Sequence, residues 1–129
     1  MLRHLWTAVL VLALSACANP QLDSYNLWMQ SARERAERGE IKWSEYYQGC
    51  FSRLADVESG VNNKLLAMGY YNALIGYALE YESGRIGKSE FDQKIRDAQL
   101  ARARREHELR YDYSRPGARA DTAGDIYPH

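Results

Sequence analysis

The chain has 129 residues, 17 basic and 17 acidic side chains, and 46% apolar residues. This length is that of one domain, and the balanced charge provides no overall field that would draw the protein to nucleic acid or to an acidic surface. The cysteines, Cys17 and Cys50, do not predict a disulfide framework, because the setting of Cys17 gives it another role.

Residues 1–16 have the layout of a signal peptide. Arg3 lies near the start, Leu5–Leu14 is an apolar run interrupted only by Thr7, and the small residues Ser15 and Ala16 follow. A membrane-spanning helix needs about 20 apolar residues, so this shorter run is not expected to remain as a transmembrane anchor.

The tetrapeptide Leu14-Ser15-Ala16-Cys17 resembles the lipobox of bacterial lipoproteins. That resemblance implies cleavage before Cys17, a diacylglyceryl thioether on its sulfur, and a further acyl chain such as palmitate on its amine. Ala18 is not aspartate, which by the same resemblance implies sorting to the outer membrane. The alternative is ordinary secretion with a cut before Asn19 and no lipid, since Ala16-Cys17-Ala18 also fits the A-x-A rule. We favour the lipid anchor because a cysteine at this position by chance is uncommon.

Residues 17–22 are expected to form the lipidated N-terminus and a short tether. Two or three acyl chains hold a protein on a membrane essentially permanently. The five residues Ala18–Leu22 reach at most ~18 Å, so the domain should lie at the membrane surface.

Residues 23–113 are predicted to form an all-α domain of four helices. Apolar residues at helical spacing, serine or aspartate caps and terminating glycines set the boundaries. The predicted helices are 24–38, 45–58, 63–83 and 90–111, capped by Asp23 or Ser24, by Ser44 and by Ser89, and ended by Gly39 and Gly84. The segment 114–129 is predicted to be a disordered tail, because it is rich in proline, glycine and polar residues.

The segment Leu65–Tyr81 is apolar on nearly every side, which predicts a buried central helix. Gly69, Ala73 and Gly76 stand at a spacing that would admit a neighbouring backbone. A membrane-inserted helix is the alternative, and Asn72 and Glu80 argue against it.

Two stretches of sequence repeat each other at an offset of 45 residues: Gly39-Glu40-Ile41-Lys42-Trp43-Ser44-Glu45-Tyr46 and Gly84-Arg85-Ile86-Gly87-Lys88-Ser89-Glu90-Phe91. In each, a glycine ends one helix and an aromatic residue begins the buried face of the next. The repeat predicts two tandem antiparallel helical hairpins. Its Gly-x-Ile turns also resemble those of SHOCT-type helical modules, although Lys42 and Gly87 stand where threonine is usual there. This resemblance implies a helical hairpin and no activity.

No catalytic or cofactor site is predicted, and we expect a non-enzyme. His107 and His129 have no second metal ligand at a suitable spacing. Glu45 and Glu90 are interpreted as favourable charges in the first turns of their helices. Cys50 lies on an apolar stripe and is expected to pack as a small buried hydrophobic residue.

A possible interaction surface lies in the last predicted helix. Arg102, Arg104, Arg105 and Arg110 alternate there with glutamates, a pattern typical of a solvated face. The functional alternative is contact with lipid phosphates or with an acidic partner. Trp43 is either an exposed contact residue or part of the core, and we favour the core.

These features together predict a bacterial envelope lipoprotein on the periplasmic face of the outer membrane. It would act as a non-catalytic protein-interaction or assembly module, comparable by size and architecture alone to pilotin-like chaperones. The alternative is a helical periplasmic protein that binds a small molecule or lipid in a cavity lined by Tyr70, Tyr77 and Tyr81.

Overall fold

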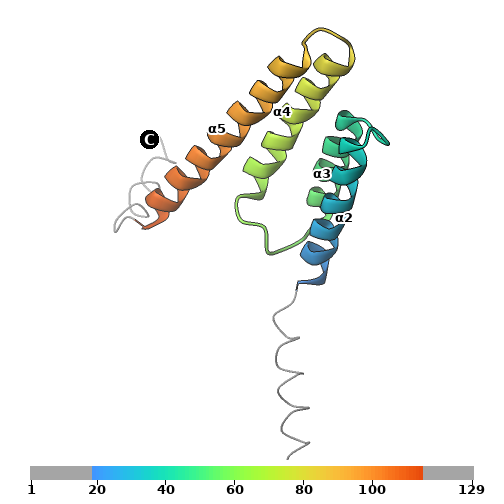
Figure 1. Cartoon of the computed structure of the whole chain (residues 1–129). Helices are drawn as coiled ribbons and strands as arrows, with labels where there is room; N and C mark the ends of the chain where they lie inside the picture. Colours follow the sequence, from blue (N-terminus) through green and yellow to red (C-terminus); the bar gives the residue numbers. More distant parts are fainter. Residues whose placement is uncertain (1–18, 115–129) are drawn as a thin grey trace, which may run out of the picture. The chain divides into compact units, whose positions relative to one another are not determined.

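The computed structural model describes residues 19–114, and the regular secondary structure of this range is entirely α-helical (Figure 1). The helices are α2 (Pro20–Glu37), α3 (Trp43–Asp56), α4 (Lys64–Glu82) and α5 (Lys88–Ser114). The predicted all-α class with four helices is therefore confirmed. None of these four helices has both the length and the apolar character needed to cross a membrane. The predicted signal peptide, Cys17 and residues 115–129 of the predicted tail lie outside the described residues, whereas Ser114, predicted to begin the tail, is the last residue of α5.

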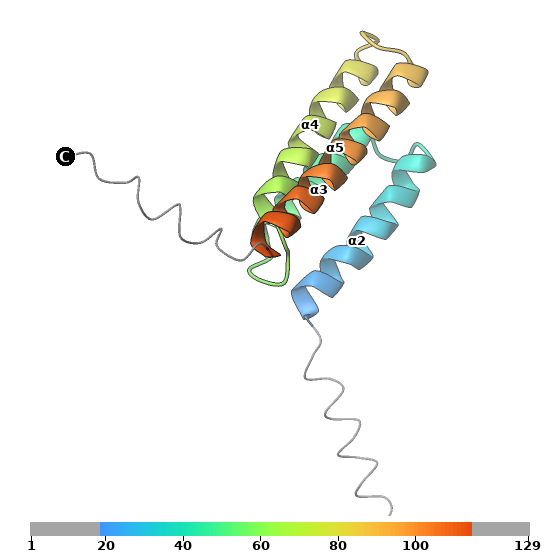
Figure 2. The ribbon, with the colours of Figure 1, turned by 90° about the vertical axis from the view of Figure 1, so that its left-hand side faces the viewer.

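The four helices form two compact units, one ending at Lys64 and the other beginning at Leu65. In the first unit α2 packs against α3, and in the second α4 runs beside α5 (Figures 1 and 2). A short turn joins the helices within each pair, so each unit is an antiparallel hairpin. The two tandem hairpins predicted from the repeat are confirmed.

The first hairpin turns at Gly39, whose φ of 73° is in the left-handed region that glycine adopts at little cost. The Gly39 amide donates a hydrogen bond to the carbonyl of Ala36 at 3.0 Å, and the Glu40 amide donates to the carbonyl of Arg35 at 2.9 Å. These two bonds form a Schellman motif and satisfy carbonyls at the end of α2.

The second hairpin repeats this turn 45 positions later. Gly84 has a φ of 77°. Its amide donates to the carbonyl of Tyr81 at 3.0 Å, and the Arg85 amide donates to the carbonyl of Glu80 at 2.9 Å. The sequence repeat is thus a repeat of backbone conformation.

The first helix begins earlier than predicted. Asn19 is the N-cap of α2, and its side-chain oxygen accepts a hydrogen bond from the Leu22 amide at 3.2 Å. Pro20 occupies the first helical position, where its missing amide hydrogen costs nothing. The predicted caps Asp23 and Ser24 are wrong, since both lie within the helix.

The predicted caps Ser44 and Ser89 are also wrong, because α3 begins at Trp43 and α5 at Lys88. Ser44 is buried, and the carboxylate of Glu45 accepts a hydrogen bond from the Lys42 amide at 3.3 Å. A first-turn glutamate therefore satisfies the start of α3.

The core of the first hairpin combines small residues of α2 with larger ones of α3. Alanines on α2 allow the two helices to approach, and the tyrosines and Leu54 of α3 fill the space between them. The buried apolar residues of this hairpin are Tyr25, Ala32, Ala36, Tyr46, Tyr47, Cys50, Leu54 and Val57.

The buried residues of the second hairpin are Ala67, Leu74 and Ala78 of α4 and Phe91 of α5. Half-buried tyrosines of α4 also contact side chains of α5. Tyr81 stacks on Phe91 with ring centroids 4.8 Å apart and an interplanar angle of 9°. The Lys94 ammonium lies 5.0 Å from the centroid of the Tyr77 ring. These contacts hold the end of α4 against the beginning of α5.

The expectation that α4 is buried on nearly all sides is wrong. Leu65 is 85% exposed and Leu79 is 47% exposed, and Gly69, Asn72 and Gly76 between them are exposed as well. A Cβ atom added at Gly69 or Gly76 would meet no atom within 4 Å among the described residues. The backbone of α5 therefore does not approach these glycines, and α4 uses its other face for packing.

Candidate functional site

The predicted lipidation residue, Cys17, lies outside the described residues, but the described chain begins only two positions after it. Asn19 joins this start to the loop that follows α3. Its Nδ2 donates a hydrogen bond to the carbonyl of Ser59 at 3.0 Å. Gln21, the second residue of α2, accepts a hydrogen bond on Oε1 from the Glu58 amide at 3.1 Å. The N-terminus of α2 is thus fastened to residues 58 and 59.

A groove lies beside this junction, between the start of α2 and the end of α3. Its volume is about 390 Å³, within the range of small-molecule sites. Its walls are apolar except for neutral polar side chains and two charged ones, the basic Arg53 and the acidic Asp56. The lining residues are Pro20, Gln21, Ser24, Tyr25, Arg53, Asp56 and Val57.

Arg53 also takes part in the packing of the first hairpin. Its guanidinium lies 4.4 Å from the ring centroid of Trp28. The Trp28 ring lies so close to the backbone of Gly49 that a Cβ atom there would be 2.2 Å from the Trp28 Cη2 atom. Glycine at position 49 therefore lets the Trp28 ring of α2 pack directly against the backbone of α3.

Trp43, predicted as a contact or core residue, lies in an aromatic cluster at the start of α3. Its ring is edge-on to Tyr46, with centroids 5.8 Å apart, and stacks on Tyr47 at 5.9 Å. Both tyrosines are buried, and Trp43 is half-buried. Trp43 therefore packs against the core with part of its surface exposed.

Arg102 takes part in the packing of the second hairpin. Its guanidinium lies 5.0 Å from the Tyr70 ring centroid and forms an ion pair with Glu106 at 2.8 Å. The side chain of Arg102 is only 30% exposed. Burial lowers the pKa of Arg102, but the hydrogen bond that Arg102 donates to Glu106, the charge of that carboxylate and the interaction with Tyr71 outweigh this effect, so the pKa is raised. The guanidinium is therefore already engaged within the hairpin.

The other three predicted arginines are exposed on α5. Arg105 forms an ion pair with Glu108 at 3.0 Å. Within the described part of the chain, no ion pair is recorded for Arg104 or Arg110. A hollow of about 410 Å³ lies beside this segment, and its lining consists of Arg105, His107, Glu108, Tyr111 and Asp112. These arginines belong to the second unit and Trp43 belongs to the first.

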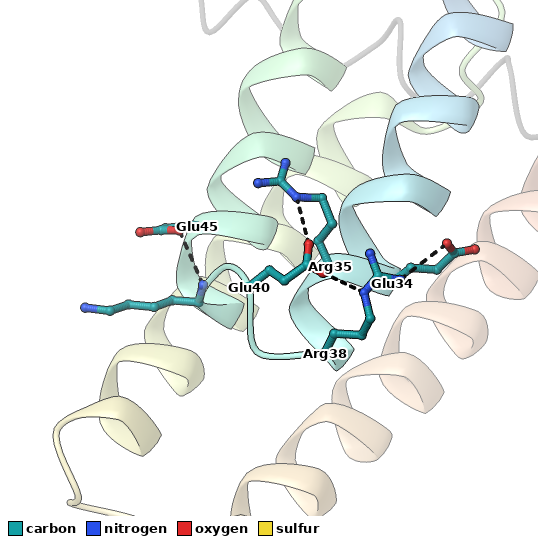
Figure 3. Close-up of polar contacts among 6 residues, drawn as sticks. Glu34, Arg35, Arg38, Glu40 and Glu45 are labelled. Carbon is teal, nitrogen blue, oxygen red and sulfur yellow. Dashed lines mark hydrogen bonds and ion pairs between the residues drawn. The ribbon is translucent and has the colours of Figure 1, made fainter.

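A cluster of charges surrounds the first hairpin turn (Figure 3). Arg38 pairs with Glu40 at 2.7 Å and with Glu34 at 4.0 Å, and Arg35 pairs with Glu40 at 3.5 Å. The hydrogen bond from Arg38 lowers the pKa of Glu40. These side chains are about half exposed, so water and salt screen the pairs and each contributes little to stability.

Cys50 is completely buried, and this burial raises the pKa of its thiol to about 11. A thiol that stays protonated and is shielded from solvent is a poor nucleophile. The prediction that Cys50 packs as a buried hydrophobic residue is consistent with this place in the α2–α3 core. Among the described residues, no group of three or more His, Cys, Asp or Glu side chains is placed to hold a metal ion.

The sequence interpretation missed Asn19, Gln21 and Arg53. Asn19 carried a recognisable signal, because an asparagine before a proline marks a helix start with its cap and first residue. Gln21 and Arg53 carried none, since their partners depend on how α2 packs against α3.

Comparison with protein-family models, with curated proteins and with solved structures gives no match to this chain.

Proposed function

We propose that the chain is a lipid-anchored protein of the bacterial envelope, held by Cys17 at the periplasmic face of the outer membrane. It would act without catalysis, by binding another protein. The observation that carries the proposal is the position of Cys17, which follows a signal-peptide-like apolar run and stands two residues before the first helix cap, Asn19. An anchor at that point leaves almost no spacer between the lipid and the folded hairpin.

The outer face of α5 is the surface that we assign to the partner. Leu100 and Tyr111 are 57% and 59% exposed, and Arg104 is exposed between them. Their spacing of four and seven residues places all three on one face of the helix. Tyrosine and arginine are enriched among the residues that dominate binding energy at interfaces. The chemistry fits an amphipathic partner helix that carries acidic side chains, as in the pilotin-like analogy.

The test is cross-linking in intact cells, followed by recovery of the protein from detergent-solubilised membranes. The variants are Cys17→Ser, Arg104→Glu and a matched control, Arg85→Glu, which makes the same charge change in the α4–α5 turn. Cys17→Ser should leave the membrane fraction. Arg104→Glu should stay in the membrane and lose about tenfold or more of the recovered partner, which corresponds to about 1.4 kcal/mol of binding free energy.

Arg85→Glu should recover the partner as the unchanged protein does. Recovery of no envelope protein with the unchanged chain would contradict the proposal. Equal recovery with Arg104→Glu and Arg85→Glu would remove α5 as the contact surface.

The alternative, binding of a small molecule or lipid, is favoured by one observation, the groove of about 390 Å³ in the first hairpin. The tyrosines expected to line a cavity contact α5 instead, Tyr70 through Arg102, Tyr77 through Lys94 and Tyr81 through Phe91. Native mass spectrometry of protein extracted from membranes tests this alternative. It predicts a bound molecule that is lost from Arg53→Ala, and extraction with no bound molecule would contradict it.

A further inference from the structure

We infer that one end of the first hairpin, made of Asn19 and residues 57–63, is the surface that faces the bilayer, and that its partner is the layer of lipid headgroups. We call this surface the loop end. The inference rests on the proposed lipidation of Cys17. It adds which end of the first hairpin lies against the membrane and which end points away.

The first step is the distance from the anchor to the fold. Two residues separate the Cα atoms of Cys17 and Asn19 by at most ~7 Å. Asn19 is held from both sides of its amide, because Oδ1 accepts from the Leu22 amide and Nδ2 donates to the Ser59 carbonyl. The lipid is therefore tied to the loop end, whatever path the chain takes between the two residues.

The second step is that the loop end is itself fastened to the hairpin. The Lys64 ammonium donates hydrogen bonds to the carbonyls of Ala55 at 2.8 Å and Val57 at 2.6 Å, where α3 ends. Val57 is buried, and the Glu58 amide is bonded to Gln21. The loop is thus held at its start and at its finish, and it cannot act as a long spacer between the membrane and the helices.

The third step concerns which part of the hairpin can lie on the bilayer. A helix that lies in the interface needs an apolar face towards the lipid. The exposed side of α2 carries Leu27 as its single large apolar residue among polar and charged ones such as Arg33 and Glu37. This side is unsuited to lying flat, so the hairpin should stand on its loop end.

The position of the hairpin turn follows from the length of α2. A helix of 18 residues is about 27 Å long, so an upright hairpin displays its turn about that far from the headgroups. The charged cluster of Arg35, Arg38 and Glu40 then points into the aqueous compartment.

The chemistry of the loop end fits headgroups of no net charge. Its exposed side chains include Ser59 and Asn62, which are neutral and polar, and the acidic Glu58. The ammonium of Lys64 is already used by two backbone carbonyls. The loop end thus offers no basic patch to anionic lipids, and the acyl chains supply the affinity for the membrane.

The experiment uses the mature protein, purified from membranes, in phosphatidylcholine vesicles that contain a nitroxide-labelled headgroup as quencher. A fluorophore is attached through Asn62→Cys in the loop end or through Lys42→Cys in the turn, both in a Cys50→Ala background. Both positions are exposed. We expect quenching to be several-fold stronger at residue 62 than at residue 42. Equal quenching, or stronger quenching at residue 42, would overturn the inference.

A second variant separates the tie at Asn19 from any affinity of the loop itself. Ten glycine and serine residues inserted after Ala18 add a flexible spacer of about 17 Å root-mean-square length. The difference between residues 62 and 42 should then largely disappear, and its full retention would also overturn the inference. If the protein lacks acyl chains and does not bind the vesicles, neither position is quenched. That result refutes the proposed anchoring, whereas vesicle-bound protein with the wrong quenching pattern refutes the orientation alone.

Discussion

The contact between Trp28 and Gly49 gives the sharpest test of how the first hairpin is packed. Alanine at an exposed helical position is more favourable than glycine by about 1 kcal/mol. At position 49, however, the new methyl group would lie 2.2 Å from Cη2 and 2.6 Å from Cζ2 of Trp28. Atoms cannot approach so closely, so the Trp28 ring must move away from α3.

The cost of this movement can be worked from the contacts that hold the ring. Trp28 stacks on Tyr46 with centroids 6.4 Å apart and carries the Arg53 guanidinium at 4.4 Å. Overpacking costs about 1–3 kcal/mol, and a cation–π contact contributes about 0.5–1 kcal/mol. After the gain in helix propensity is subtracted, we expect Gly49→Ala to lower the free energy of unfolding by about 0.5–3 kcal/mol.

Urea denaturation of the mature protein in mild detergent measures this change. Trp28 and Trp43 both belong to the first hairpin, so tryptophan fluorescence follows the unfolding of that unit, and circular dichroism follows all four helices. Gly76→Ala is the matched control, because a Cβ atom there meets nothing within 4 Å among the described residues. It should be neutral or stabilising by up to about 1 kcal/mol.

A double-mutant cycle tests whether the clash with the Trp28 ring causes this destabilisation. In a Trp28→Ala background the methyl group has room, and Gly49→Ala should become stabilising by up to about 1 kcal/mol. A stabilising effect of Gly49→Ala in the unchanged protein would refute the packing described here. So would the same destabilisation with and without the Trp28 ring.

Three further predictions concern single side chains. Because burial raises the pKa of Cys50 from its ordinary 9.0 to about 11, the unfolded state ionises first as the pH rises. Between pH 9 and pH 11, the free energy of unfolding should therefore fall by up to about 2–3 kcal/mol more than that of Cys50→Ala, as measured by denaturation at pH 8 and at high pH. Parallel pH profiles of the two proteins would contradict this. Asn19→Ala should lower the free energy of unfolding by about 1–2 kcal/mol in urea denaturation, because the helix cap is lost. The exposed control Asn62→Ala should change it by no more than about 0.5 kcal/mol, and equal effects would show that the Asn19 contacts are not stabilising. Arg102→Gln should destabilise the second hairpin by about 1 kcal/mol in thermal unfolding and Arg104→Gln by almost nothing, and the reverse order would be inconsistent with the contact on Tyr70.

The parts of the fold that depend on local backbone geometry were predictable from sequence. Gly39 and Gly84 mark the two turns because each needs a positive φ, which glycine adopts cheaply. The repeat around them therefore predicted two hairpins with similar turns. The aromatic residues Tyr46 and Phe91, predicted to begin the buried faces of the second and fourth helices, are both buried.

The parts that depend on contacts between helices were not predictable in the same way. The place of Trp28 against Gly49 requires the register of α2 on α3, which no local pattern specifies. In the sequence, Arg102 does not differ from the neighbouring arginines, but in the structure its contact with Tyr70 makes it part of the packing between α4 and α5. The exposed side of α4 was missed because a nearly uniform apolar sequence does not show which face packs.

The central claim is that this chain is tied to a membrane through Cys17, directly next to the folded hairpin. Mass spectrometry of the N-terminal peptide of the mature protein, isolated from membranes, tests it most directly. We expect the first residue to be Cys17, carrying a diacylglyceryl group and a further acyl chain. A mature chain that begins at Asn19 without fatty acid would contradict it.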